Sequence, residues 1–342
     1  MAYTGTGTEA DPYLVDNITD LITCMGIGGF IKLTADIDGT NSPTTNGNSI
    51  SVNSFTLDGD GHSLNNFAWI KTNNARTFCF FTSSYKTITM KNLTFNISLI
   101  WNYKSTESNN YIVFANSTYV NYINCDIKYK AYLSEKASLE SEYRYSCSGT
   151  LMTGSYDNSF TNCNVICDVY LITATNSLSS IIYGSNFYDS IIKINIYDPM
   201  GWGKAAKYPI FNVGLGNNSG ALSNCTIDNC GVFVTYNADV DMVSDRKYIY
   251  ITGGGMCTVV NSYFVYENTG VVSLTPVINY TYFLTYAFYD ITKAPDLARN
   301  LCTYHFDSSQ FMGLTTDQCK SRSTFEGPTA VLPFKLKQSV EP

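Results

Sequence analysis

A short pattern of apolar and polar positions returns six times along this chain. In each copy an apolar run meets a turn of small residues, and a second run closes on a polar residue flanked by apolar ones. The closing residues are Asn92, Asn124, Asn162, Lys193, Asn224 and Asn261, at steps of 32, 38, 31, 31 and 37 residues. A repeat period of about 20–50 residues is typical of solenoids and related repeat architectures. The pattern therefore predicts a chain built from stacked copies of one unit.

The runs inside each copy have the period of β-strands. Residues 93–99, 125–129 and 163–169 alternate with period two and are rich in β-branched and aromatic side chains. Helical periods are scarce. The best candidates are residues 16–25, with Asp16 as the capping residue, and residues 295–301.

One such unit is too small to bury its apolar side alone, but stacked units bury it between them. Stacking also aligns equivalent residues in columns, with about 4.8 Å between neighbouring coils. We therefore expect the asparagines to form a structural ladder at one turn, because short polar side chains satisfy turn backbone groups locally. The expected ladder is Asn92, Asn124, Asn162, Asn224 and Asn261, with Lys193 capping or interrupting it.

The predicted fold is all-β, a single-stranded, right-handed parallel β-helix solenoid with a short N-terminal capping helix. The right hand follows from the general rule for parallel crossover connections. Residues 1–29 are expected to form the N-terminal cap segment and residues 30–312 the β-helix. Residues 313–342 would form a closing segment and an extended C-terminal tail.

Two flanking segments resemble a known family. The opening at residues 5–21, which contains Asp11-Pro12-Tyr13, is similar to the start of bacterial and phage surface β-helix proteins of the pectate-lyase-like type. The turn at residues 58–64 matches the next coil of that family, and residues 313–327 are similar to its closing segment, although the Trp-Asp-Phe cluster that usually follows is absent. The resemblance implies a phage fibre, spike or decoration protein, an adhesin or sugar-binding surface protein, or an enzyme that cleaves polysaccharide.

Composition favours an outward-facing role. Charged residues are 14% of the 342, against about a quarter in ordinary globular chains. The net charge of −7 and the lack of a basic stretch argue against a nucleic-acid partner. No apolar run approaches the roughly 18 residues of a membrane span, and the first residues lack the features of a signal peptide. An outward-facing protein that lacks a signal peptide is typical of phage structural proteins, so we expect this chain to be made in the host cytoplasm and to lie on the virion surface.

The cysteines and the glycosylation triplets fit that compartment. Cys125, Cys163 and Cys225 are expected as small buried residues in one column, and disulfides are not expected in a reducing cytoplasm. No zinc-type spacing accompanies them, so neither a metal nor another cofactor is predicted. The triplets that begin at Asn92 and Asn224 would place glycans on the ladder, which favours a setting without glycosylation machinery.

An enzyme on this fold would need paired carboxylates about 5–9.5 Å apart. The candidate catalytic residues are Asp239, Asp241 and Asp245 in a charged insertion, with a solvated loop as the alternative. Asp58 and Asp60 flank a glycine turn beside His62, and Glu135, Glu140 and Glu142 lie in another insertion. These groups are better explained as a turn and a solvated loop or short helix, so the sequence favours a non-enzymatic role.

Aromatic residues are the remaining functional feature. The chain has 27 tyrosines, 19 phenylalanines and 3 tryptophans. Exposed tyrosine and tryptophan suit sugars and protein interfaces, since the rings supply contact area at little entropic cost. The candidate binding residues in the insertions are Trp101, Tyr103, Tyr143, Tyr145, Trp202 and Tyr208. Packing of loops on the coil, or filling of a trimer interface, is the equal alternative.

The sequence thus predicts a bacteriophage structural protein, such as a tail fibre, tailspike, head fibre or surface decoration. Its expected partners are other virion proteins, a host-surface polysaccharide and two further copies of itself in a homotrimer. Two rivals stay open. A polysaccharide lyase or hydrolase would release soluble fragments, and a bacterial surface adhesin would carry a signal and an anchor.

Overall fold

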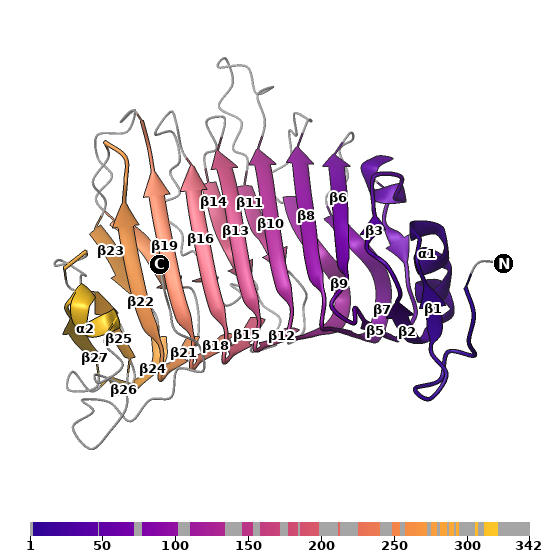
Figure 1. The fold of residues 1–342 in the computed structure, drawn as a ribbon. Helices are drawn as coiled ribbons and strands as arrows, with labels where there is room; N and C mark the ends of the chain where they lie inside the picture. The colour runs from indigo at the N-terminus through magenta and orange to yellow at the C-terminus, as the bar shows by residue number, and fades with distance from the viewer. Residues whose placement is uncertain are drawn as a thin grey trace, which may run out of the picture.

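In a computed structural model the chain winds into successive coils whose strands form two parallel β-sheets. The structure describes all residues except 1–2, 47, 72–76, 102–109, 134–145, 153–157, 172–176, 184, 198–210, 213–224, 240–247, 254–256, 272–274, 279–280, 286, 291, 294–304, 307–310 and 321–342. Figure 1 shows the strands side by side in chain order, from the N-terminal to the C-terminal end of the stack. This arrangement confirms the predicted parallel β-helix.

One sheet, here called sheet B, takes one strand from each coil. Among the described residues it has 10 strands, and each pairs in parallel with the strand one coil away. They are β3 Ile37–Asp38, β6 Ser63–Lys71, β8 Thr94–Trp101, β10 Asp126–Leu133, β13 Asn164–Leu171, β16 Ile191–Tyr197, β19 Gly231–Asn237, β22 Tyr263–Asn268, β25 Ala287–Asp290 and β27 Phe311–Leu314.

The other sheet, sheet A, takes two strand segments from most coils and has 17 strands among the described residues. The long strand β7 pairs with both strand segments of the previous coil, β4 and β5, and the long strand β9 pairs with both segments of the next coil, β11 and β12. The strands are β1 Tyr13–Val15, β2 Gly29–Leu33, β4 Ile50–Ser51, β5 Phe55–Asp58, β7 Thr77–Lys91, β9 Asn110–Ile123, β11 Ser146–Met152, β12 Asn158–Thr161, β14 Ser177–Tyr183, β15 Ser185–Tyr188, β17 Phe211–Asn212, β18 Cys225–Asp228, β20 Tyr248–Gly253, β21 Cys257–Val260, β23 Thr275–Ile278, β24 Thr281–Thr285 and β26 His305–Phe306.

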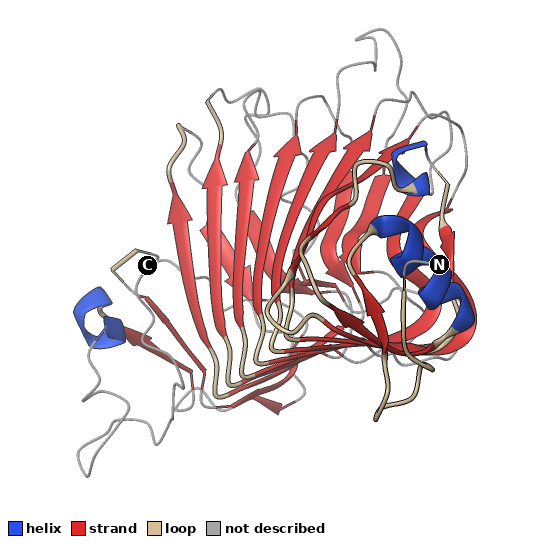
Figure 2. Ribbon diagram, turned by 45° about the vertical axis from the view of Figure 1, so that its right-hand side comes forward, coloured by secondary structure: helices blue, strands red, loops and turns tan. Residues whose placement is uncertain are grey.

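A short helix lies at the N-terminal end of the stack, as predicted. Helix α1, Ile18–Ile27, begins at Asn17, whose Oδ1 accepts a hydrogen bond from the Asp20 N–H at 3.0 Å. The prediction of Asp16 as the cap is wrong. Asp16 Oδ1 instead accepts from Asn17 Nδ2 at 2.8 Å, one residue before the helix entry. Figure 2 shows α1 beside the first strands, together with the 3₁₀ turn Pro43–Asn46.

A second helix follows the last strand of sheet B. Helix α2, Thr316–Lys320, has a reciprocal cap in which the Gln318 N–H donates to Thr315 Oγ1 and the Thr315 N–H donates to Gln318 Oε1. It falls within the predicted closing segment. The predicted helix at 295–301 and the tail from 321 lie outside the described residues.

A ladder of side-chain amides runs along the turn between sheet A and sheet B. Nδ2 of Asn92 donates to Oδ1 of Asp58 at 3.1 Å, Nδ2 of Asn124 donates to Asn92 at 3.2 Å, and Nδ2 of Asn162 donates to Asn124 at 2.7 Å. The three asparagines have φ of 53–54°, the left-handed region that asparagine tolerates better than other residues with a side chain. Each amide therefore fixes a turn and also joins it to the previous coil.

The later coils keep the turn but not the predicted register. Asp189, Asn229 and Asn261 have the same positive φ, and the amides of Asn229 and Asn261 donate to Asp189 and Asp228. Asn224, the predicted ladder residue, lies outside the described residues. Lys193 lies inside β16. The sequence around Lys193 and Asn224 resembles a turn. In the structure, Asp189 and Asn229 occupy the turn positions of these two coils.

The residue after each ladder position points inward and forms a buried column. Its members from the Asn92 turn onward, among the described residues, are Leu93, Cys125, Cys163, Ser190, Cys230 and Ser262. Cys230 Sγ and Ser262 Oγ each donate to the carbonyl two residues earlier, at 3.1 and 2.7 Å. The expectation of Cys225 in this column is wrong, because Cys225 is the first residue of strand β18.

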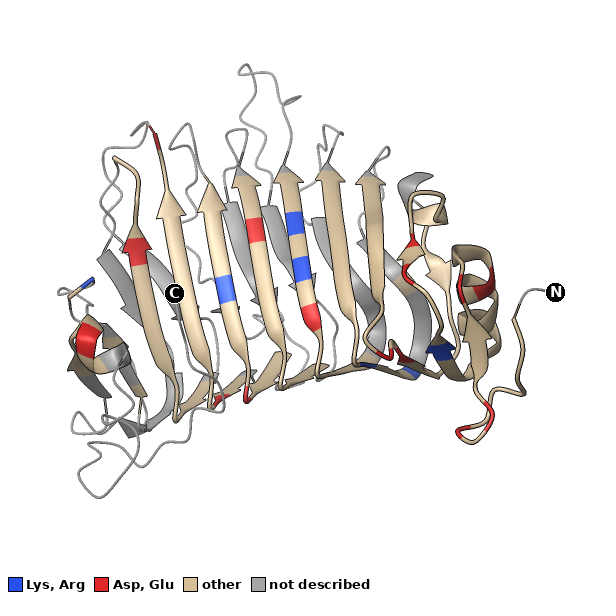
Figure 3. Cartoon of the chain, in the orientation of Figure 1, with Lys and Arg blue, Asp and Glu red and all other residues tan. Residues whose placement is uncertain are grey.

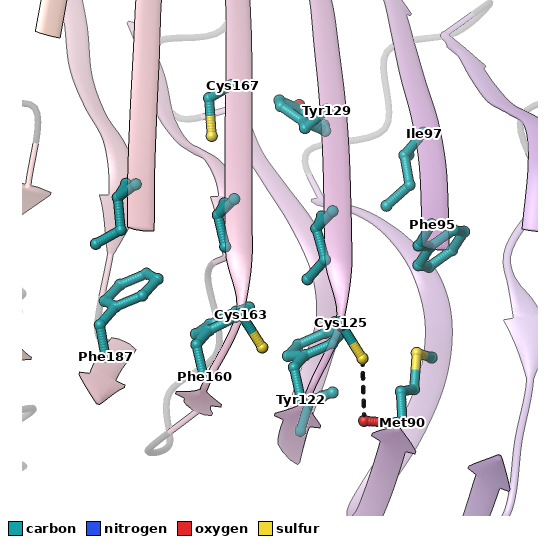
Figure 4. Close-up of a cluster of buried hydrophobic side chains, with 14 of the residues drawn as sticks. Met90, Phe95, Ile97, Tyr122, Cys125, Tyr129, Phe160, Cys163, Cys167 and Phe187 are labelled. Carbon is teal, nitrogen blue, oxygen red and sulfur yellow. Dashed lines mark hydrogen bonds between the residues drawn. The ribbon is translucent and has the colours of Figure 1, made fainter. Parts of the chain in front are cut away.

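Larger side chains fill the interior beside this column. Tyr122, Phe160 and Phe187, from successive coils, stack with ring centroids 4.6 Å apart, and all three are almost completely buried (Figure 4). Stacking of like on like follows from parallel pairing in register, which sets equivalent side chains about 4.8 Å apart. Among the described residues the core is thus a set of columns that run from coil to coil.

Candidate functional site

The outer face of sheet B carries an ordered patch of polar and aromatic side chains. Because alternate residues of a strand point to opposite faces, every second residue of β10, β13 and β16 points outward. Register places these residues in three rows that cross the strands. We call them the outer patch: Lys128, Lys130 and Tyr132 of β10; Ile166, Asp168 and Tyr170 of β13; and Lys193, Asn195 and Tyr197 of β16.

The first row is a stack of three half-buried tyrosines. The ring centroids of Tyr132 and Tyr170 are 4.8 Å apart and those of Tyr170 and Tyr197 are 4.7 Å apart, with 10° between the planes in both pairs. The inner ring faces therefore cover one another, and the row presents ring edges and hydroxyl groups to solvent. Burial and the nearby charge of Asp168 raise the pKa of Tyr170 and Tyr197, so both hydroxyls stay protonated and able to donate.

The middle row is polar throughout. Lys130, Asp168 and Asn195 are aligned on adjacent strands, and Asn195 Nδ2 donates to Asp168 Oδ1 at 2.8 Å. This bond orients both the carboxylate and the amide. The pair offers donor and acceptor atoms beside the tyrosine hydroxyls, as hydroxyl-rich ligands require.

The third row mixes lysines with apolar residues. Lys128 and Lys193 flank Ile166, and the next strand, β19, adds Phe233. Lys193 Nζ lies 5.7 Å from the Phe233 ring centroid, within cation–π range. Figure 3 shows the basic positions on β10 and β16, with an acidic position between them on β13.

The binding residues predicted from the insertions lie mostly beyond the described structure. Trp101 ends strand β8, and its side chain is not described. Tyr103, Tyr143, Tyr145, Trp202 and Tyr208 lie outside the described residues. The outer patch is made of other residues, which the sequence analysis did not select.

A sequence signal for the tyrosine row did exist. Tyr132, Tyr170 and Tyr197 each lie seven residues after the inward residue of the turn, namely Cys125, Cys163 and Ser190. The offset is visible only when the coils are aligned on the correct turn. The sequence analysis placed the turn of this coil at Lys193, so the position of Tyr197 did not match those of Tyr132 and Tyr170.

Of the predicted carboxylate clusters, the structure describes only Asp58, Asp60 and Asp239. Asp239 is exposed just after β19, and Asp241 and Asp245 lie outside the described part of the chain. Asp58 pairs with Lys91 at 3.1 Å, and Asp60 pairs with Lys32 at 2.9 Å. The remaining predicted cluster, Glu135, Glu140 and Glu142, also lies outside the described residues.

The ion pairs at Asp58 and Asp60, and the contact of His62 Nδ1 with Asp36 Oδ1 at 3.6 Å, join the second coil to its neighbours. Within the described ranges, no three His, Cys, Asp or Glu side chains gather in a way that suits a metal ion. The same ranges contain no helix long and apolar enough to cross a membrane.

Comparison with known proteins returned no match, whether against protein-family models, curated proteins or solved structures. The fold and the outer patch are therefore the basis for a functional assignment.

Proposed function

We propose that this chain is a non-enzymatic structural protein of a bacteriophage virion, a fibre, spike or surface decoration, that attaches to a glycan on the host surface. The observation that carries the proposal is the outer patch on sheet B. Its hydroxyl, amide, carboxylate and ammonium groups lie on paired strands and not on loops. Groups held by a rigid scaffold lose little entropy on binding, which favours recognition of a flexible, hydroxyl-rich polymer.

The patch has the chemistry of sugar recognition. The tyrosine hydroxyls donate, the Asp168 carboxylate accepts, and the Asn195 amide supplies a further donor, within rows set by the strand spacing of about 4.8 Å. Each contact is weak on its own. Many copies on one particle would raise the overall strength of attachment, which suits a homotrimer anchored to other virion proteins.

Two features of the described structure support a virion made in a reducing cytoplasm. Five cysteines, Cys24, Cys125, Cys163, Cys167 and Cys230, are buried and free. Asn92, which begins a glycosylation triplet, uses its Nδ2 to hold the ladder to Asp58, so a glycan on that atom would break the ladder. The fold therefore suits a compartment in which asparagine side chains are not glycosylated.

The test measures binding and cleavage together. Purified full-length chain is incubated with surface polysaccharides from a panel of bacteria, and both retention and newly formed sugar ends are assayed. We expect binding without cleavage, and weaker binding by Tyr170→Ala. Tyr119→Ala is the matched control, because Tyr119 is an exposed tyrosine on sheet A, in β9.

New sugar ends would instead support a lyase or hydrolase. Binding that Tyr119→Ala and Tyr170→Ala weaken equally would remove the outer patch from the proposal. An antibody against the chain should label phage particles, and labelling of bacterial envelopes instead would favour an adhesin.

A further inference from the structure

We infer that the outer patch selects an acidic polysaccharide, whose anionic groups lie over Lys128 and Lys193 while its hydroxyls face the Asp168–Asn195 pair. The inference rests on the proposed glycan attachment and adds the chemical class of the polymer and its direction across the strands.

The first argument is the state of the lysines. Lys32, Lys91 and Lys293 are held by carboxylates at 2.9–3.1 Å. In the described part of the chain, by contrast, no ion pair involves the three lysines of the outer patch, Lys128, Lys130 and Lys193. Within the described residues, a chain with a net charge of −7 thus places three lysines without an ion-pair partner on one face. Such a face complements an anionic partner.

The second argument is the disposition of the acidic groups nearby. Asp168 lies in the middle row and accepts from Asn195, so it repels a ligand anion there and favours a ligand hydroxyl. Asp126 is at the first position of β10, two residues before Lys128. The row that contains Lys128, Ile166, Lys193 and Phe233 has no carboxylate, so it is the row suited to an anion.

The third argument is spacing. Lys128 and Lys193 are two strands apart, about 10 Å along the axis of the stack. The tyrosine row lies four residues further along the strands, about 13 Å away. A polymer that contacts both lysines must therefore cross β10, β13 and β16 along that axis, with the middle row beneath it. The Phe233 ring helps to fix one end, since it orients the Lys193 ammonium.

The experiment compares two forms of one polymer. Alginate, a polyuronate, and carboxyl-reduced alginate differ in charge and share a backbone. The wild-type chain should bind alginate at least five-fold more tightly, and 500 mM salt should remove most of that preference because exposed charges are screened. Lys128→Gln and Lys193→Gln should each weaken alginate binding about two- to five-fold, and the double variant about ten-fold.

Lys86→Gln is the matched control, because it makes the same change in charge in β7 of sheet A. Equal affinity for the two polymers, or equal losses for Lys86→Gln and Lys128→Gln, would overturn the inference. If the chain binds neutral glycans and the lysine variants bind them as well as wild type, this inference fails and the proposed function stands. If no glycan of either kind binds, the proposed function itself fails.

The same variants distinguish a second copy of this chain as the occupant. Light scattering should give one molar mass for wild type and for the double variant. Dissociation of the double variant into smaller species would show that the lysine row is an interface between copies, and would overturn the inference.

Discussion

Asn162 donates a hydrogen bond from its side-chain amide to Oδ1 of Asn124, 38 residues earlier in the chain, at 2.7 Å. Both residues have φ of 53°. One residue type thus meets two requirements at the same turn. It tolerates the left-handed conformation, and it joins neighbouring coils through a group that both donates and accepts.

Asn124→Ala should lower the free energy of unfolding by about 2–3 kcal/mol. About 1 kcal/mol comes from each of its two ladder bonds, and a similar amount comes from placing alanine at positive φ. Asn124→Gly, which loses the bonds but tolerates the conformation, should be less destabilised than Asn124→Ala. Urea unfolding measures both, and equal losses would show that the backbone conformation contributes nothing.

Tyr170→Ala should lower the free energy of unfolding by about 1–3 kcal/mol, because it removes the middle ring and both of its stacking contacts. Tyr170→Phe keeps the ring and should stay within about 0.5 kcal/mol of wild type, since a substitution at a surface position that keeps its packing has little effect. Urea unfolding of the pair separates the ring from the hydroxyl. A loss in Tyr170→Phe as large as in Tyr170→Ala would contradict stabilisation by stacking.

Cys163→Ser should change the free energy of unfolding by less than about 1 kcal/mol. Ser190 and Ser262 already occupy the same column and donate to carbonyl oxygens two residues earlier. Cys167→Ser is the contrast. Burial and the charge of Asp168 raise the pKa of the Cys167 thiol, and the side chain is completely buried in β13 among apolar residues.

Position 167 lies inside a strand and not at the turn where Ser190 and Ser262 find their carbonyl acceptors. The free energy of unfolding of Cys167→Ser should therefore fall by about 1–3 kcal/mol, the cost of burying a hydroxyl without a partner. Thermal unfolding of both serine variants checks the ranking. The reverse order would mean that the column does not accept serine.

Acid should weaken the second coil through Asp58. Burial alone raises the pKa of Asp58, but hydrogen bonds from Asn92 and the Asp60 N–H, together with Lys91, outweigh it and leave the pKa below its ordinary value. A lowered pKa in the folded state means that the stabilisation is present above the unfolded value of about 3.9. It is lost as pH falls through the lower folded value.

Asp58→Asn should therefore be less stable than wild type at pH 6, and the difference should shrink below about pH 3. Urea unfolding across this range measures the difference. Asp239→Asn, at an exposed position beyond β19, is the control, and a difference that is independent of pH would contradict the role of the Asp58 charge.

The alternation of apolar and polar residues was enough to predict the parallel β-helix, because strand periodicity and a repeat of 31–38 residues allow few other ways to bury the apolar side. The ladder of Asn92, Asn124 and Asn162 could also be predicted, since each asparagine closes a similar run of apolar residues.

Only the tertiary structure decided the register of the later coils and the outer patch. The chain advances 27 residues from Asn162 to Asp189 and 40 from Asp189 to Asn229, and only pairing with the neighbouring coil shows which polar residue takes the turn. Tyr132, Tyr170 and Tyr197 become one row because parallel strands in register place equal offsets side by side. Local periodicity fixes which face a side chain takes, whereas contact between coils depends on loop lengths that periodicity does not constrain.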